Sequence, residues 1–186
     1  MTEDIEASNT SGWYEGDDGF RPIGNNSADD FNGSFDGAGN NIAGLTIDRS
    51  SEDRTGLFDT VGTPGTVRNV GVVQADVTGR NRVGGIAGQN EGTVTDVGVL
   101  GSVAGTNRVG STVGRNNGGD VTNAQADGTV SGNFRVGGTV EHSDGGVSGA
   151  RVAAGVSGTE QAGGAVGYDA GTVTSAAARG DVSGNE

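Results

Sequence analysis

The chain has 186 residues and a net charge of −13, from 24 acidic and 11 basic side chains, and it contains no Cys. The lack of Cys excludes disulfides and thiolate metal sites, and no apolar run reaches transmembrane length. The acidity of the chain argues against nucleic acid or an anionic membrane as a partner. Only 31% of the residues are apolar and 39 are Gly, a composition that by itself would indicate disorder.

The charged residues are unusual in type. All 11 basic residues are Arg, and Asp outnumbers Glu 16 to 8. At ordinary ionic strength this net charge would destabilise a compact chain through self-repulsion, whereas in molar salt the Debye length shrinks to about 3 Å and the repulsion largely vanishes. We therefore predict that the protein comes from a salt-loving organism. An ordinary acidic surface is the alternative, but it leaves the absence of Lys unexplained.

Residues 1–19 form an acidic, polar lead-in whose start, MTEDIEASNT, lacks the features of a signal peptide. If the parent protein is secreted, we expect this chain to be an excerpt of it. Residues 20–76 hold nearly all the bulky apolar side chains, and we expect them to form an N-terminal cap and the first coils of a repeat structure. These side chains are Phe20, Phe31, Phe35, Leu45, Ile47, Leu57 and Phe58.

Residues 77–186 are built from a repeat that begins with a Val-x-Gly tripeptide. The tripeptides start at intervals of 26, 27, 26 and 26 residues, at Val77, Val103, Val130, Val156 and Val182. A fixed period in this range is typical of a solenoid, in which each repeat stacks on the next. Because Val182 opens a further copy, we expect the array to continue beyond residue 186.

The apolar positions within one repeat indicate short strands. If side chains alternate along the second strand, Val83, Gly85 and Ala87 face inward. The outward positions are then Ile86 and its equivalents in the later coils, Thr112, Thr139 and Ala165.

Turn-favouring residues separate the strands. After Val94 the apolar pattern changes phase, and we place a corner at the residues Asp96, Asn123, Gly149 and Ser175. A second turn, with Asn and Asp in left-handed conformations, is expected at Asn90, Asn116, Ser143 and Asp169. The predicted fold is all-β, a parallel β-solenoid (β-helix) of about six coils, either right- or left-handed.

The order of motifs resembles that of GLUG-motif repeat proteins. The resemblance runs from about Phe20 to Gly184, and it is most specific in FNGSFDGAGNNIAGLTI and in VGGIAGQNEGTV at residues 83–94. The chain departs from the pattern at Glu141, where the other coils have Gly88, Gly114 and Gly167. Such motifs occur in surface-exposed and secreted proteins, including adhesin-like proteins and parts of secreted peptidases. The resemblance implies an extracellular or cell-surface location and a structural role without an active site.

Three arginines form the candidate ligand-binding residues. Arg82, Arg108 and Arg135 precede the same Val column in consecutive coils, with Gln161 in the fourth. We expect them to point outward and to stack about 5 Å apart, where like charges repel unless an anion or an acidic side chain pairs with them. One hypothesis is a docking strip for a carboxylate- or sulfate-bearing glycan. The alternative is repeat redundancy, neutralised by nearby acidic residues and screened by salt.

Other candidate sites are weaker. His142 is the only histidine, and with no nucleophile motif around it we interpret it as an exposed turn residue. The acidic pairs Asp17-Asp18 and Asp29-Asp30 could bind Ca²⁺, but they lack the spacing of known calcium loops, and a solvated acidic surface is the preferred interpretation. We expect no catalytic residues, no metal and no cofactor.

The predicted function is that of a non-catalytic structural or adhesion module, acting as a rigid spacer or a weak surface for acidic glycans or other surface proteins. A carbohydrate-active β-helix enzyme and a recognition appendage of a larger secreted peptidase are the alternatives. No membrane insertion is expected, and the exposed C-terminal edge could let copies associate end to end.

Overall fold

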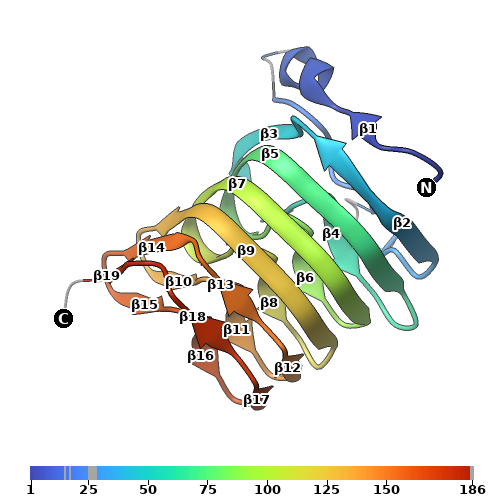
Figure 1. Ribbon diagram of the computed structural model, residues 1–186. Helices are drawn as coiled ribbons and strands as arrows, with labels where there is room; N and C mark the ends of the chain where they lie inside the picture. Colours follow the sequence, from blue (N-terminus) through green and yellow to red (C-terminus); the bar gives the residue numbers. More distant parts are fainter. Residues whose placement is uncertain (15, 17, 25–28, 185–186) are drawn as a thin grey trace.

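The computed structural model describes residues 1–14, 16, 18–24 and 29–184. It is a parallel β-solenoid of about five turns, so the predicted fold class is confirmed with a slightly smaller number of coils. Figure 1 shows the turns stacked side by side, with the two ends of the chain at opposite ends of the stack.

Each central turn consists of one long, bent strand and one short strand. The long strands β5 (Thr66–Val83) and β7 (Thr93–Gly110) belong to a 14-stranded sheet, called here the large sheet. The short strands β6 (Ala87–Asn90) and β8 (Val113–Asn116) belong to a five-stranded sheet, the small sheet. All strand pairs between turns are parallel, so residues one repeat apart in the sequence lie beside each other.

The first turn contains three strands, β2 (Ser34–Ala43), β3 (Thr46–Thr55) and β4 (Phe58–Val61). In the later turns the long strand is divided into shorter pieces at its corners. The remaining strands are β9 (Asp120–Gly132), β10 (Arg135–Gly137), β11 (Val140–Ser143), β12 (Gly146–Ser148), β13 (Arg151–Val152), β14 (Gly155–Gly158), β15 (Gln161–Gly163), β16 (Val166–Asp169), β17 (Thr172–Thr174), β18 (Ala177–Ala178) and β19 (Val182–Ser183).

The predicted corner after Val94 is present in every turn from β5 onward. Its residues all have a left-handed backbone, with φ between 52° and 65°, and they are Asn69, Asp96, Asn123, Gly149 and Ser175. Asn, Asp and Gly adopt this conformation at low cost, because short polar side chains bond locally and Gly has no Cβ. The corner bends each long strand, which lets its Val side chains on both sides of the bend point into the solenoid.

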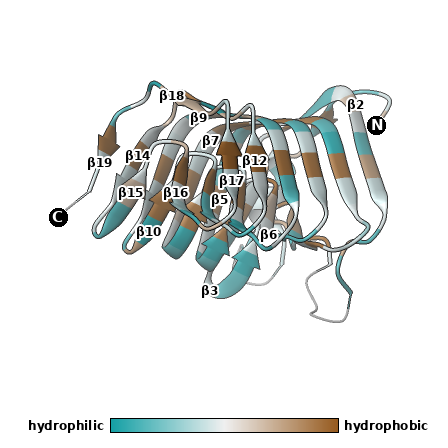
Figure 2. Cartoon of the chain, turned by 90° about the horizontal axis from the view of Figure 1, so that it is seen from below, coloured by the Kyte–Doolittle hydropathy of each residue, from teal (hydrophilic) through white to brown (hydrophobic). Residues whose placement is uncertain are grey.

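The core consists of columns of Val. Val77, Val103, Val130 and Val156 are all buried, as are Val83, Val109 and Val136 of the next column. Figure 2 shows hydrophobic bands, in brown, at matching places on neighbouring strands. Stacking is essential because each turn shields the apolar columns of its neighbours from water.

The outward placement predicted for Ile86 is wrong. Ile86, Thr112 and Thr139 are fully buried. The alternation of inward and outward positions holds only within a continuous strand, whereas β5 ends at Val83 and the chain turns before β6 begins. The segment between β5 and β6 is hydrogen-bonded to the corresponding segment of the next solenoid turn, since the Ile86 N–H donates to the Thr112 carbonyl at 3.0 Å.

Asn90 and Asn116 mark a turn as predicted, because a bend follows each of them, but the left-handed conformation predicted for them is wrong. These residues end the short strands of the small sheet, and their side chains are fully buried. The Asn90 Nδ2 donates to the Asn116 Oδ1 at 2.8 Å, and the Asn116 Nδ2 donates to the Ser143 Oγ at 3.2 Å. This column therefore forms a ladder of side-chain hydrogen bonds between successive turns inside the solenoid.

The N-terminal end of the stack is covered by the beginning of the chain. Strand β1 (Ile5–Glu6) pairs in parallel with β2, and the short helix η1 (Ser8–Gly12) follows it (Figure 1). Behind them, Phe58 is fully buried, and its ring centroid lies 4.7 Å from that of Phe31 and 5.6 Å from that of Phe35. Aromatic cover of this kind shields the first turn from water.

Candidate anion-binding site

The predicted arginine column is longer than the sequence indicated. The strand register places Arg54, Arg82, Arg108 and Arg135 in consecutive turns, followed by Gln161. Arg54 was missed because it lies before the regular repeats, where the spacing differs. Arg54, Arg82 and Arg108 have φ between 54° and 58°, a left-handed conformation that is uncommon for a residue with a long side chain.

Contrary to the prediction, the side chains of this column do not point straight outward but reach residues of the small sheet. Arg82, Arg108 and Arg135 are half-buried. The Arg82 Nη1 donates to Gln89 Oε1 of β6 at 3.2 Å. The Arg135 guanidinium lies 5.7 Å from the centroid of the Tyr168 ring of β16. The arginines thus lie along the junction of the two sheets.

A fifth arginine, Arg115, joins the column from the small sheet. Strand register aligns Gln89, Arg115, His142 and Tyr168 in consecutive turns. We call Arg54, Arg82, Arg108, Arg115 and Arg135 the arginine strip. It contains five of the 11 arginines of a strongly acidic chain. Arg115 carried no periodic signal in the sequence, so its membership could be found only from the packing of the two sheets.

His142 is not the exposed turn residue that the sequence suggested. It lies in β11, and its ring stacks on that of Tyr168 with centroids 4.9 Å apart. Its Nε2 is 3.1 Å from the Asp144 Oδ1, and the Asp144 Oδ2 accepts from the Arg115 Nη2 at 3.0 Å. The Arg115 hydrogen bond, then that of His142, lowers the pKa of Asp144.

The positive charges of the strip are only partly compensated. Arg54 forms an ion pair with the buried Asp59, whose Oδ1 lies 2.7 Å from the Arg54 Nε. Burial, followed by the charges of Arg108, Arg115 and Arg54, lowers the pKa of Arg82. Within the described part of the chain, Arg108 has no ion pair, and the buried Nε atoms of Arg82, Arg108 and Arg115 have no hydrogen-bond partner. Half-buried guanidinium groups without a carboxylate partner, such as that of Arg108, suit an anion.

Glu141 adds a buried carboxyl beside these arginines. It is fully buried, and neither carboxylate oxygen has a hydrogen-bond partner in the described residues. Burial raises the pKa of Glu141 to about 7, although the charges of Arg108, Arg135 and Arg115 act to lower it. The sequence marked Glu141 only as a departure from glycine, without indicating what it would face.

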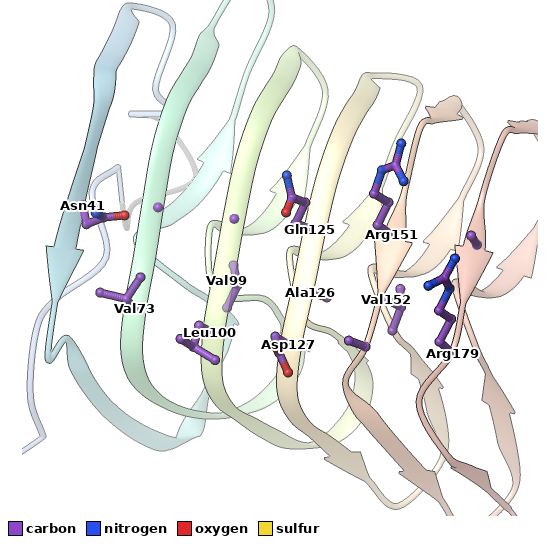
Figure 3. Close-up of a pocket in the computed structure, with 14 residues that line it drawn as sticks. Asn41, Val73, Val99, Leu100, Gln125, Ala126, Asp127, Arg151, Val152 and Arg179 are labelled. Atoms are coloured by element: carbon purple, nitrogen blue, oxygen red, sulfur yellow. The ribbon is translucent and has the colours of Figure 1, made fainter.

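A second feature is a shallow groove of about 440 Å³ on the outer face of the large sheet. Figure 3 shows Gln125, Arg151 and Arg179 projecting along it, with Leu100 and Val73 beside them. The groove also contains one carboxylate, that of Asp127. Its arginines lie on a different face from the arginine strip, which makes them useful as controls.

The described residues contain no group of three His, Cys, Asp or Glu side chains close enough to hold a metal ion. Of the acidic pairs considered for Ca²⁺, Asp29-Asp30 belongs to this part of the chain, whereas Asp17 lies outside the described residues. None of the helices found there has the length and apolar character needed to cross a membrane.

The fold defines the chain as a parallel β-solenoid repeat protein. A solved protein from Bacteroides ovatus, described as a "putative immunoglobulin A1 protease", superposes with a TM-score of 0.62 over 96% of this chain and 70% of that one. The two are 17% identical, so the likeness concerns the fold alone. No known family model matches the chain, and the resemblance to GLUG-motif proteins stays a prediction.

Two curated relatives are similar in sequence. Halomucin of Haloquadratum walsbyi is 44% identical over 102 residues, which make up 55% of this chain and 1% of that protein. A "Putative Gly-rich membrane protein" of Evansella cellulosilytica is 36% identical over 87 residues, 45% of this chain and 10% of that protein. The chain therefore matches a small part of each of these much longer relatives.

Proposed function

We propose that this chain is a non-catalytic repeat module of a surface or secreted protein from a halophile, in which it acts as a rigid spacer. The observation that carries the proposal is the in-register stacking of turns, each built from the same strands and corners. Each added turn lengthens such a stack by one strand spacing, about 4.8 Å, and contacts only its neighbours. The similarity to a segment of halomucin supports both the surface location and the saline environment.

A carbohydrate-active enzyme is the less favoured alternative. Most glycoside hydrolases use two carboxyl groups across the scissile bond. The groove on the large sheet is lined by one, Asp127, together with Arg151 and Arg179. The third possibility, a recognition appendage of a secreted peptidase, depends on which domains accompany this chain in its parent protein.

The spacer role is tested by lengthening the solenoid. Inserting four extra copies of residues 93–119, one complete turn, after Gly119 should extend the particle by about 20 Å, since each turn adds about 4.8 Å. Small-angle X-ray scattering in molar salt measures its maximum dimension. Four copies with the same residues in scrambled order serve as the control and should add a mobile loop. A particle that aggregates or unfolds with the native copies would contradict the spacer proposal.

A second candidate function, weak binding of acidic glycans, rests on the arginine strip. The guanidinium groups of Arg108 and Arg135 are only half-buried and have no ion pair in the described residues, so they can donate to sulfate or carboxylate oxygens. The half-exposed Tyr168 ring beside Arg135 offers an apolar surface for a sugar ring. Both features lie at one junction between the sheets, so a single extended ligand could contact several turns.

The double variant Arg108→Ala, Arg135→Ala should weaken binding of a sulfated oligosaccharide at least tenfold, because it removes two of the three strip arginines that have no ion pair in the described residues. Binding is measured by calorimetry in about 2 M salt, where nonspecific attraction is screened. Arg151→Ala, Arg179→Ala removes the same charge from the other face and should leave affinity unchanged. Equal losses in the two double variants would mean that only overall charge matters, and absence of binding by the folded wild type would eliminate this function.

A further inference from the structure

We propose that Glu141 is a built-in counter-ion of the arginine strip, which competes with external anions when it is ionised and releases the strip to bind sulfate groups when it is protonated. This inference rests on the proposed ligand-binding role of the strip and assigns the regulation of that site. It is carried by three observations: the position of Glu141 in the repeat, its burial without partners, and the charges around it.

Glu141 occupies a column that elsewhere has little room for a side chain. Strand register aligns it with Gly114 and Gly167 of the neighbouring turns. A Cβ at Gly114 would overlap the backbone of Arg82, which shows how closely the small sheet approaches the arginine corner. A side chain at Glu141 is thus placed directly against that corner. A residue that breaks the local rules of a repeat is expected to mark a functional or a strained site.

The same column contains one other carboxylate, Asp59, which forms an ion pair with a strip arginine. Asp59, aligned with Gly88 of the next turn, is buried and pairs with Arg54 at 2.7 Å. The first strip arginine is therefore neutralised from within the column. Glu141 holds the corresponding place beside Arg108 and Arg135, whose charges act on it most strongly.

The difference between the two carboxylates lies in their pairing. Asp59 accepts from the Thr60 hydroxyl at 2.8 Å as well as contacting Arg54. Glu141 has neither kind of contact within the described residues, although it is fully buried. A buried carboxylate is costly unless it is paired, so Glu141 can exist either as a neutral acid or as the partner of nearby guanidinium groups. That choice sets the charge of the strip.

Every element packed around β11 carries charged or titratable groups. The charges that act on Glu141 are those of Arg108 of β7, Arg115 of β8 and Arg135 of β10. The other titratable groups on β11 and its neighbour β16 are His142, Tyr168 and Asp169, and Asp144 follows β11. Arg115 is already paired with Asp144. Ionised Glu141 therefore compensates chiefly Arg108 and Arg135. Burial raises its pKa to about 7, so the change falls near neutral pH.

The experiment measures binding of a sulfated oligosaccharide at pH 5.5 and pH 8.5 at one fixed molar salt concentration. Sulfate remains ionised at both pH values, so any change comes from the protein. The wild type should bind at least fivefold more weakly at pH 8.5. Glu141→Gln should bind equally at both pH values, with the affinity of the wild type at pH 5.5, because it keeps the shape of the acid and cannot ionise.

A second variant, Glu141→Gly, restores the residue of the neighbouring turns and should also remove the pH dependence. It keeps the test decisive if Gln is poorly accommodated. Because both variants retain His142, a pH dependence that persists in them would assign the effect to another group and overturn the proposal. A second result would also overturn the proposed role of Glu141: wild-type binding that does not depend on pH but is lost in Arg108→Ala, Arg135→Ala. In that case the arginine strip would still be a ligand site. Absence of binding by the folded wild type at both pH values would overturn the ligand function itself.

Discussion

Gly110→Ala is expected to lower the free energy of unfolding by about 3 kcal/mol or more, at the upper end of the cost of overpacking. A Cβ at this position would overlap the carbonyl oxygen of Val113 and lie 2.8 Å from the Thr139 carbonyl oxygen and 2.9 Å from the Glu141 nitrogen. All three are backbone atoms. Val113 is the first residue of β8, Thr139 lies just before β11 of the next solenoid turn, and Glu141 lies within β11. They cannot move aside without breaking hydrogen bonds between turns.

Every turn has glycine at this place. The column consists of Gly56, Gly84, Gly110, Gly137 and Gly163. Glycine is required here because the chain folds back from the large sheet onto the small one with no space between their backbones. The position is thus one of close approach rather than of unusual backbone dihedrals, since Gly110 does not have a positive φ.

Gly98→Ala is the matched control on the same strand. A Cβ there meets nothing within 4 Å, and φ is not positive, so the change should alter stability by less than about 1 kcal/mol. Urea unfolding of both variants at one molar salt concentration gives the two free energies. Similar losses in Gly110→Ala and Gly98→Ala would show that general glycine entropy, and not the close approach, accounts for the effect.

The second large effect concerns the pH dependence of stability. Glu141 has a pKa raised by burial from its ordinary 4.5 to about 7, so the folded state binds its proton more tightly than the unfolded state. Below pH 4.5 the carboxyl is protonated in both states, and it has no effect on the difference between them. As pH rises toward 7 the unfolded state releases the proton first, and stability falls.

Above pH 7 the wild type should be less stable than Glu141→Gln by about 3 kcal/mol, since one pKa unit corresponds to about 1.4 kcal/mol. The difference should shrink to near zero below pH 4.5. Urea unfolding of both proteins from pH 4 to 8.5 at constant salt measures it. Other groups such as Asp59 and Asp144 titrate in both proteins and cancel in the comparison. Parallel stability curves for the two proteins would mean that ionised Glu141 is fully compensated by the arginines.

The sequence alone determined the architecture of the repeats. The period of the Val-x-Gly tripeptides, the columns of Val77 and Val83 and the corner at Asp96 could all be predicted, and the structure confirms them. These features follow from local chemistry repeated along the chain: Val favours strands, and Asp, Asn and Gly tolerate left-handed corners. Copies of the same length must then stack in register.

Only the tertiary structure decided which side chains meet between the two sheets. The burial of Ile86, the ladder of Asn90 and Asn116, and the gathering of Arg115 and Glu141 at the arginine column all depend on where the chain folds back after the long strands. Alternation along a strand carries no information beyond the turn that ends it. The neighbours of Glu141 come from four strands in three different turns, so no spacing within one repeat could predict them.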